Sequence, residues 1–175
     1  MPPPSRPNIL FLFTDRLRAD CIDALGSSKI KTPNIDRLVR GGKAFTNCYT
    51  PSPVRAPARQ SLCSGLPPHI TGRVDNVDAF NDSPSFMQSL VDSCYQAHAI
   101  GKMHFSKRLG DWGFTSRDIS EEIITRDSPD DYRNDLYENG YEHVIDTHGP
   151  GSELYYLPQP SQLPESLHLG SLTGA

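Results

Sequence analysis

The residues best suited to chemistry in this sequence follow its apolar segments. Asp15 comes directly after an early apolar run, and Lys102 and His104 follow a later one. Arg59 lies where a loop leads into a helix, and Asn76 lies in a polar loop. In open α/β sheets, ligands bind beyond the carboxyl ends of the strands. A carboxylate and several basic groups at such ends suggest a metal ion that faces a bound oxyanion.

Each of these residues also has an ordinary structural interpretation. Asp15 alone could be a turn former at the end of a strand. Arg59 alone is more often a solvated surface residue than a ligand-binding one. A lysine and a histidine two residues apart carry little information by themselves. Only the order and spacing of the whole set favour a functional site.

The elements that must position these residues alternate between strands and helices. Residues 8–13 form an apolar run bounded by proline and Thr-Asp, which is typical of a strand buried in a parallel sheet. Further strands are expected over residues 44–49 and 95–100. Helices are expected from Thr32-Pro33 to Gly41-Gly42, from Pro57 to Leu62, and after Ser83-Pro84. This alternation predicts an α/β sandwich.

Composition limits the class of protein. The 175 residues include 17 basic and 21 acidic side chains, which gives a net charge of −4 and no general attraction to nucleic acid. No apolar run approaches the ~18 residues of a membrane span or the ~7–15 of a secretory signal. We therefore expect no nucleic-acid or membrane partner and a cytoplasmic location. The four cysteines have no C-x-x-C spacing and are expected to be free, buried thiols.

An ordered set of segments resembles the N-terminal portion of the sulfatase family. The segments are Arg6–Asp15, Lys31–Leu38, Phe45–Pro53, Ala56–Leu62, Ser64–Leu66 and Ile100–His104, with a further match over Tyr155–His168. The resemblance implies an alkaline-phosphatase-like α/β sandwich with a mostly parallel central sheet, incomplete in this chain. It implies that residues 1–105 are the N-terminal part of the catalytic domain. Residues 106–175 would be a truncated, loop-rich continuation of the same domain, mobile and poorly stable on its own.

The resemblance also implies a role for each matching residue. Asp15 matches an aspartate that holds a calcium or magnesium ion in the family. Arg59 matches the arginine that supports the nucleophile. Lys102 and His104 match the pair that holds the substrate oxyanion and the nucleophile. Asn76 is a weaker match to an asparagine that contacts the oxyanion in some members.

Two positions depart from the family pattern. The family nucleophile is a cysteine or serine, converted to formylglycine, two residues before the motif proline; here that position is Arg55. A guanidinium stays protonated and has no lone pair for attack. The residue after Asp15 supplies a metal oxygen in the family and is Arg16 here. We therefore expect neither family-like turnover nor micromolar binding of a divalent metal ion.

Three functions remain open at this point. The first is a sulfuric ester hydrolase by family, acting on a small-molecule sulfate ester, with this chain inactive. The second is a metal-free anion-binding pseudoenzyme in which cationic side chains hold sulfate or another oxyanion. Those side chains would be Arg16, Arg55, Arg59, Lys102 and His104. The third is a non-functional fragment.

Overall fold

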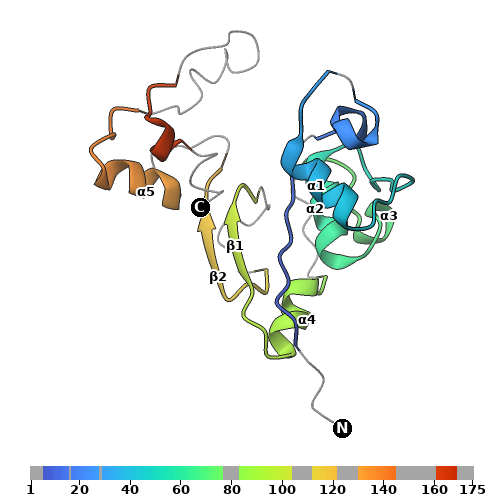
Figure 1. The fold of residues 1–175 in the computed structure, drawn as a ribbon. Helices are drawn as coiled ribbons and strands as arrows, with labels where there is room; N and C mark the ends of the chain where they lie inside the picture. Colours follow the sequence, from blue (N-terminus) through green and yellow to red (C-terminus); the bar gives the residue numbers. More distant parts are fainter. Residues whose placement is uncertain are drawn as a thin grey trace. The chain divides into compact units, whose positions relative to one another are not determined.

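The chain divides into two compact units, residues 1–49 and residues 50–175. The computed structural model describes residues 6–15, 17–27, 29–76, 83–103, 112–121, 130–144 and 161–168. Figure 1 shows the elements in sequence colours. No helix among these residues is both long enough and apolar enough to cross a membrane.

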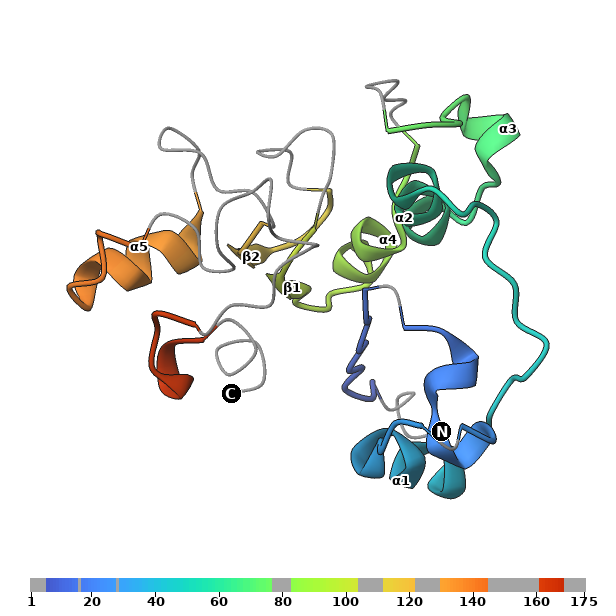
Figure 2. The ribbon, with the colours of Figure 1, turned by 90° about the horizontal axis from the view of Figure 1, so that it is seen from above.

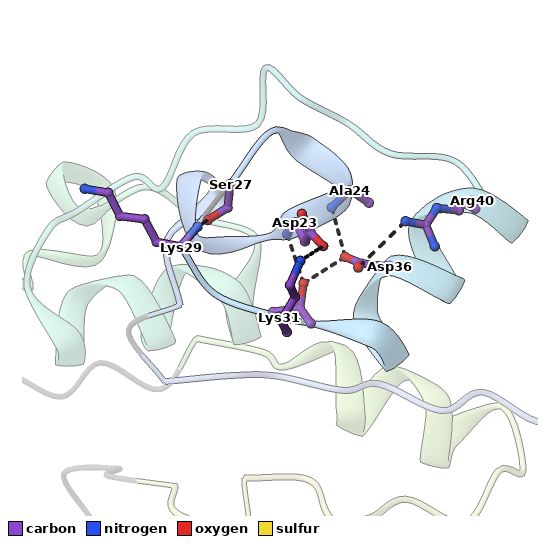
Figure 3. A network of polar contacts seen from close by, with 8 residues as sticks. Asp23, Ala24, Ser27, Lys29, Lys31, Asp36 and Arg40 are labelled. Carbon is purple, nitrogen blue, oxygen red and sulfur yellow. Dashed lines mark hydrogen bonds and ion pairs between the residues drawn. The ribbon is translucent and has the colours of Figure 1, made fainter.

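The first unit contains helix α1 and two short 3-10 turns. Their bounds are η1 Ala19–Cys21, η2 Asp23–Leu25 and α1 Pro33–Gly41. Helix α1 begins at the predicted proline, but the Thr32 side chain does not cap it. Instead the Thr32 hydroxyl accepts from the N–H of Asp23 at 3.0 Å and donates to Asp36 at 2.8 Å (Figure 3). Thr32 therefore ties η2 to α1.

The carboxylate of Asp36 is the centre of this first unit. Asp36 is 3% exposed and accepts from the N–H of Ala24 at 2.9 Å (Figure 3). Arg40, one turn further along α1, forms an ion pair with it at 3.8 Å. The N–H of Ala24, the Thr32 hydroxyl and the charge of Arg40 lower the pKa of Asp36 below its ordinary value, against the opposing effect of burial.

Two predicted strands of the first unit are not formed in the described part of the chain. The side chains of residues 9–13 are 55–82% exposed, and the segment has no strand assignment. Residues 44–49 contain a turn, and all of them are exposed. A strand is stabilised by the ladder hydrogen bonds of a neighbour, and an apolar pattern alone does not supply that neighbour. The predictions of these two strands were therefore wrong for this structure.

Three helices open the second unit. They are α2 Arg55–Ser64, α3 Pro68–Thr71 and α4 Phe86–Asp92. Helix α2 begins two residues before the predicted start and ends at Gly65, whose φ of 72° is a left-handed conformation that glycine adopts readily. Helix α4 is capped by Ser85 rather than by Ser83. The Ser85 hydroxyl accepts from the N–H of Gln88 at 3.1 Å and donates to the carbonyl of Trp112 at 2.7 Å.

A two-stranded parallel sheet follows the helices. Strands β1 His98–Gly101 and β2 Ser116–Ile119 lie side by side, with His98 opposite Ser116 and Gly101 opposite Ile119 (Figure 2). Strand β1 confirms the last part of the strand predicted over 95–100. Strand β2 was missed because its sequence, Ser-Arg-Asp-Ile, has almost no apolar signal.

Helix α5 and a late segment form a small core in the region where the sequence pattern fades. Helix α5 spans Asp131–Glu138, and η3 spans Glu165–Leu167. Tyr132, Leu136, Val144 and Leu163 are each 1–7% exposed and pack together. The buried Asp130 joins α5 to the end of β2, since its carboxylate accepts from the N–H groups of Arg133 and Glu121. These residues were expected to be loops, because the acidic run around Asp130 hides the apolar spacing of α5.

The cysteines are free, as predicted. Cys21, Cys48, Cys63 and Cys94 form no disulfide. The expectation that the thiols are buried is correct only for Cys63, which is 7% exposed on α2. Burial raises the pKa of the Cys63 thiol to about 11, against a smaller lowering by the charge of Arg59. Cys63 therefore stays protonated at neutral pH.

Candidate functional site

Helix α2 positions two of the predicted site residues. Arg55 is its first residue and is half-buried, and Arg59 follows one turn later and is 9% exposed. Residues four apart lie on the same face of a helix. The helix therefore presents two guanidinium groups along one face, with the first at its N-terminus.

Arg59 joins α2 to the segment that follows β1. Its Nη1 donates to the carbonyl of Lys102 and to the carbonyl of Met103, each at 2.9 Å. These partners lie 43 and 44 residues further along the chain. The structure thus places the Arg59 guanidinium against the main chain at Lys102. It does so through backbone carbonyls that no sequence motif specifies.

Lys102 comes directly after the last residue of β1. Gly101 ends that strand with a φ of 101°, a conformation that side-chain-bearing residues rarely adopt. Lys102 is half-buried, and the neighbouring Met103 is 6% exposed. The end of β1 therefore places a cationic residue at the carboxyl end of a parallel strand, where ligands of α/β proteins bind.

Asn76 lies beside the first turn of α2. Its Oδ1 accepts from the N–H of Ala56 at 3.2 Å, although the two residues are 20 apart in sequence. Asn76 is otherwise exposed. Its side chain is therefore held next to the first turn of α2, and its predicted contact with an oxyanion stays a prediction.

Three other predicted residues do not belong to the described part of the second unit. His104 and Arg16 lie outside the described residues. Asp15 is an exposed residue of the first unit, whereas Arg55, Arg59, Asn76 and Lys102 belong to the second. Of the predicted site residues, the described part of the second unit therefore contains Arg55, Arg59, Asn76 and Lys102.

Among the described residues, the side chains do not make up a site for a calcium or magnesium ion. Calcium takes about 6–8 oxygen ligands, mostly from carboxylates and carbonyls. In the described ranges, no group of three or more His, Cys, Asp or Glu side chains lies together. Among the described residues, Asp15 is the one carboxylate that the family pattern assigns to a metal ion. No step of the function proposed below is therefore assigned to a metal ion.

The local charge of the site is opposite to that of the chain. Arg55, Arg59 and Lys102 are cations, while the net charge of the chain is −4. The N-terminus of a helix adds a partial positive charge of about half an elementary charge. The site is therefore suited to attracting an anion such as sulfate or phosphate.

Comparison with known proteins matches this chain to one family. Residues 7–159 match the family model described as Sulfatase. The chain is 31% identical over 145 residues to an N-acetylglucosamine-6-O-sulfatase from Bacteroides thetaiotaomicron. The alignment covers 81% of this chain and 25% of that protein. It is 29% identical over 171 residues to a choline-sulfatase from Rhizobium meliloti, in an alignment that covers 97% of this chain and 29% of that protein. The chain thus spans about a quarter of the length of these relatives.

A solved structure shows the same fold. The phosphonate monoester hydrolase of Agrobacterium radiobacter aligns with 96% of this chain at a TM-score of 0.72 and 21% identity. The alignment covers 36% of that hydrolase. The predicted fold class, an incomplete alkaline-phosphatase-like α/β fold, is confirmed by this likeness. The short parallel sheet and the surrounding helices are the part of the fold that this structure describes.

Proposed function

Because this chain belongs to the sulfatase family, we propose that it carries the oxyanion-stabilising part of a sulfuric ester hydrolase site. The substrate class is a small-molecule sulfate ester, attacked at sulfur by a nucleophile that displaces the alcohol. Arg59 and Lys102 would stabilise the oxyanion, with His104 and Asn76 as further candidates. We also propose that residues 1–175 do not turn over such esters, because Arg55 occupies the nucleophile position.

The observation that carries this proposal is the link between Arg59 and the backbone at Lys102. Two hydrogen bonds of 2.9 Å hold a cationic residue of α2 against the carboxyl end of β1. The two bonds hold the charge of the Arg59 guanidinium in place, and a charge held in place stabilises developing negative charge on sulfate oxygens more effectively than water does. The link therefore supports a site built to receive an oxyanion.

Arginine at position 55 cannot take the place of the missing nucleophile. Its guanidinium stays protonated and offers no lone pair for attack on sulfur. It also places a full positive charge at the helix terminus that already favours anions. The substitution therefore removes bond formation but increases the attraction for the substrate class.

This cationic cluster also favours a second function, which is anion binding without turnover. Arg55, Arg59 and Lys102 belong to the same unit, and arginine binds sulfate and phosphate through its planar fork of donors. No metal ion is needed for such binding. In this alternative, sulfate is a ligand rather than a product.

The test of turnover uses a chromogenic aryl sulfate and four forms of the chain. We expect the original chain and Arg55→Ala to release no phenol above buffer. Arg55→Cys, produced together with a formylglycine-generating enzyme, restores the family motif Cys-Ala-Pro-Ala-Arg. Its conversion is read by mass spectrometry of the peptide that contains position 55. Turnover by the original chain that disappears in Arg59→Gln would contradict the proposed inactivity.

The test of anion binding is a calorimetric titration with sodium sulfate at constant ionic strength. Replacing Lys102 or Arg55 by Gln should weaken binding by about tenfold each, because a hydrogen bond to a charged group contributes about 1.5–3 kcal/mol. Arg37→Gln is the matched control, since it removes one exposed charge from α1 in the other unit. Equal effects of all three changes would indicate attraction by net charge alone.

A further inference from the structure

We propose that Asn76 positions the first turn of α2 by capping that helix from 20 residues further along the chain. Residue 76 is therefore a positioning residue for position 55, in addition to any contact that it makes with an oxyanion. The inference rests on the proposed function only for the role given to position 55. The cap itself is argued from the contacts of the helix terminus.

The first turn of α2 lacks a cap from its own sequence. Its N-cap residue is Val54, whose side chain has no acceptor. The N–H of Val54 donates to Ser52 Oγ at 3.1 Å, and Pro57 has no N–H at all. The N–H of Ala56, the second residue of the helix, is the kind of donor that an N-cap side chain normally satisfies.

Asn76 supplies the missing acceptor. Its Oδ1 accepts from the N–H of Ala56 at 3.2 Å. Asparagine is among the preferred capping residues because its short side chain carries a strong acceptor. Its position is unusual, since a capping residue normally precedes its helix directly. The cap therefore connects two segments that are separated in sequence by the rest of α2 and by α3.

Residues 65–76 lead the chain from the end of α2 back to the start of the same helix. Gly65 ends α2 and Gly72 ends α3, each in a left-handed conformation, with φ of 72° and 73°. Arg73, which follows, is 3% exposed and so fixes the start of the returning segment. The chain then reaches Asn76 as an exposed residue beside the start of α2.

The consequence for position 55 follows from the geometry of the helix terminus. Residue 55 precedes the capped N–H directly, so fraying of the first turn would displace it first. With Oδ1 engaged, the amide plane of Asn76 is fixed as well. The cap thus holds the backbone of position 55 in place relative to Arg59.

The first part of the test measures amide exchange of Ala56 by NMR. Asn76→Ala removes the acceptor and should speed exchange at Ala56 by about five- to tenfold, since losing an N-cap costs about 1 kcal/mol. Asn76→Asp keeps an acceptor of equal capping strength and should retain the protection. Unchanged exchange at Ala56 in Asn76→Ala would overturn the inference.

The second part uses a thiol introduced at position 55 and needs no turnover. In the Arg55→Cys background without conversion, alkylation is followed against pH and assigned to each cysteine by peptide mass. Asn76→Asp should raise the pKa of the introduced thiol and slow its alkylation at pH 7 by about three- to tenfold, because a carboxylate on the Ala56 N–H lies beside it. Val74→Asp is the control, since it adds the same charge at an exposed neighbour outside the cap.

The outcomes separate this inference from the proposed function. Cys63, buried on the same helix, reports unfolding if it becomes reactive. If Asn76→Ala makes Cys63 reactive and therefore unfolds the helix, the comparison of Asn76→Asp with Val74→Asp tests the positioning role instead. Equal shifts of the alkylation profile at position 55 by the two aspartates would overturn the positioning role. Failure of the sulfate-binding test alone would leave the cap intact and contradict only the proposed function.

Discussion

At the scale of single residues, the carboxylate of Asp36 shows how one buried group organises a unit. It accepts from the N–H of Ala24 and from the Thr32 hydroxyl, and it pairs with Arg40. These partners favour the charged form, so the pKa of Asp36 in the folded chain lies below its ordinary value. A group with a lowered folded pKa stabilises the fold above its unfolded pKa and loses that effect as the pH falls.

This sign gives a prediction for stability against pH. The contribution of Asp36 should be complete above about pH 4 and should disappear as the pH falls through its lowered pKa. We expect Asp36→Asn to lower the melting temperature at pH 7 and to flatten the loss of stability in acid. Thermal melts across an acid-to-neutral pH series measure both.

Asp20→Asn is the control for that prediction. Arg18 also lowers the pKa of Asp20, but both side chains of this pair are largely exposed. Its contribution should therefore disappear in high salt, since exposed ion pairs are screened. An effect of Asp36→Asn that also vanishes with salt would show that neutral donors do not stabilise the Asp36 carboxylate.

At the scale of elements, glycine sets how closely a turn approaches α4. A Cβ at Gly113 would lie 2.6 Å from the backbone N of Gln88 and 2.8 Å from its Cα. Backbone atoms in a helix cannot move aside easily. The φ of Gly113 is also left-handed, at 80°. The turn that carries the Trp112 carbonyl to Ser85 therefore depends on the absence of a side chain at position 113.

We predict that Gly113→Ala destabilises the chain more than a matched change elsewhere. Gly140 has a φ of 82° and nothing within 4 Å of its Cβ position, so Gly140→Ala carries the backbone strain alone, about 1–2 kcal/mol. Gly113→Ala adds a steric clash and should cost a further ~1–3 kcal/mol. Urea unfolding midpoints of the two variants give the difference directly, and equal midpoints would exclude the clash.

Helices were easier to predict from this sequence than strands, for a physical reason. The Thr-Pro start of α1 is a local signal that acts within one turn. Residues 8–13 carry a strong apolar pattern, yet a strand there requires a partner that the pattern cannot supply. Strand β2 shows the reverse case, because β1 pairs with it although its own side chains are mostly polar.

The sequence motifs proposed candidate site residues but not the contacts between them. The motif match proposed Arg59 and Lys102 separately, and in the structure Arg59 donates to the main chain at Lys102. It did not reveal that the joining atoms are backbone carbonyls, or that Asn76 caps α2. Both contacts depend on the path of the chain between distant residues. A signal for the cap does exist in the sequence, since Val54, the residue before the helix, has no side-chain acceptor for the N–H groups of the first turn.

At the scale of the whole molecule, apolar surface is distributed unevenly. The second unit buries Tyr132, Leu136, Val144 and Leu163 around α5. In contrast, the consecutive apolar side chains of residues 9–13 are all more than half exposed. Contiguous exposed apolar segments promote association between chains.

We therefore predict that the chain self-associates through residues 9–13 as its concentration rises. The double change Leu10→Lys and Leu12→Lys should reduce light scattering without lowering the melting temperature, because both side chains are exposed. Leu38→Lys, an exposed leucine on α1, serves as the control. Equal reduction by the control would show that added charge, rather than the segment, governs association.

Arg59 donates two hydrogen bonds to the main chain, here called the Arg59 clasp. They make it possible to test the charge of the site and its framework separately. Both of its acceptors are main-chain oxygens, those of Lys102 and Met103. Every residue type has such an oxygen, so neither acceptor depends on the type of side chain at its position. Replacing Lys102 therefore changes the electrostatic field of the site while its framework stays in place. Replacing Arg59 changes the electrostatic field and the framework at once. Comparing the two replacements therefore separates the effect of the charge from the effect of the framework.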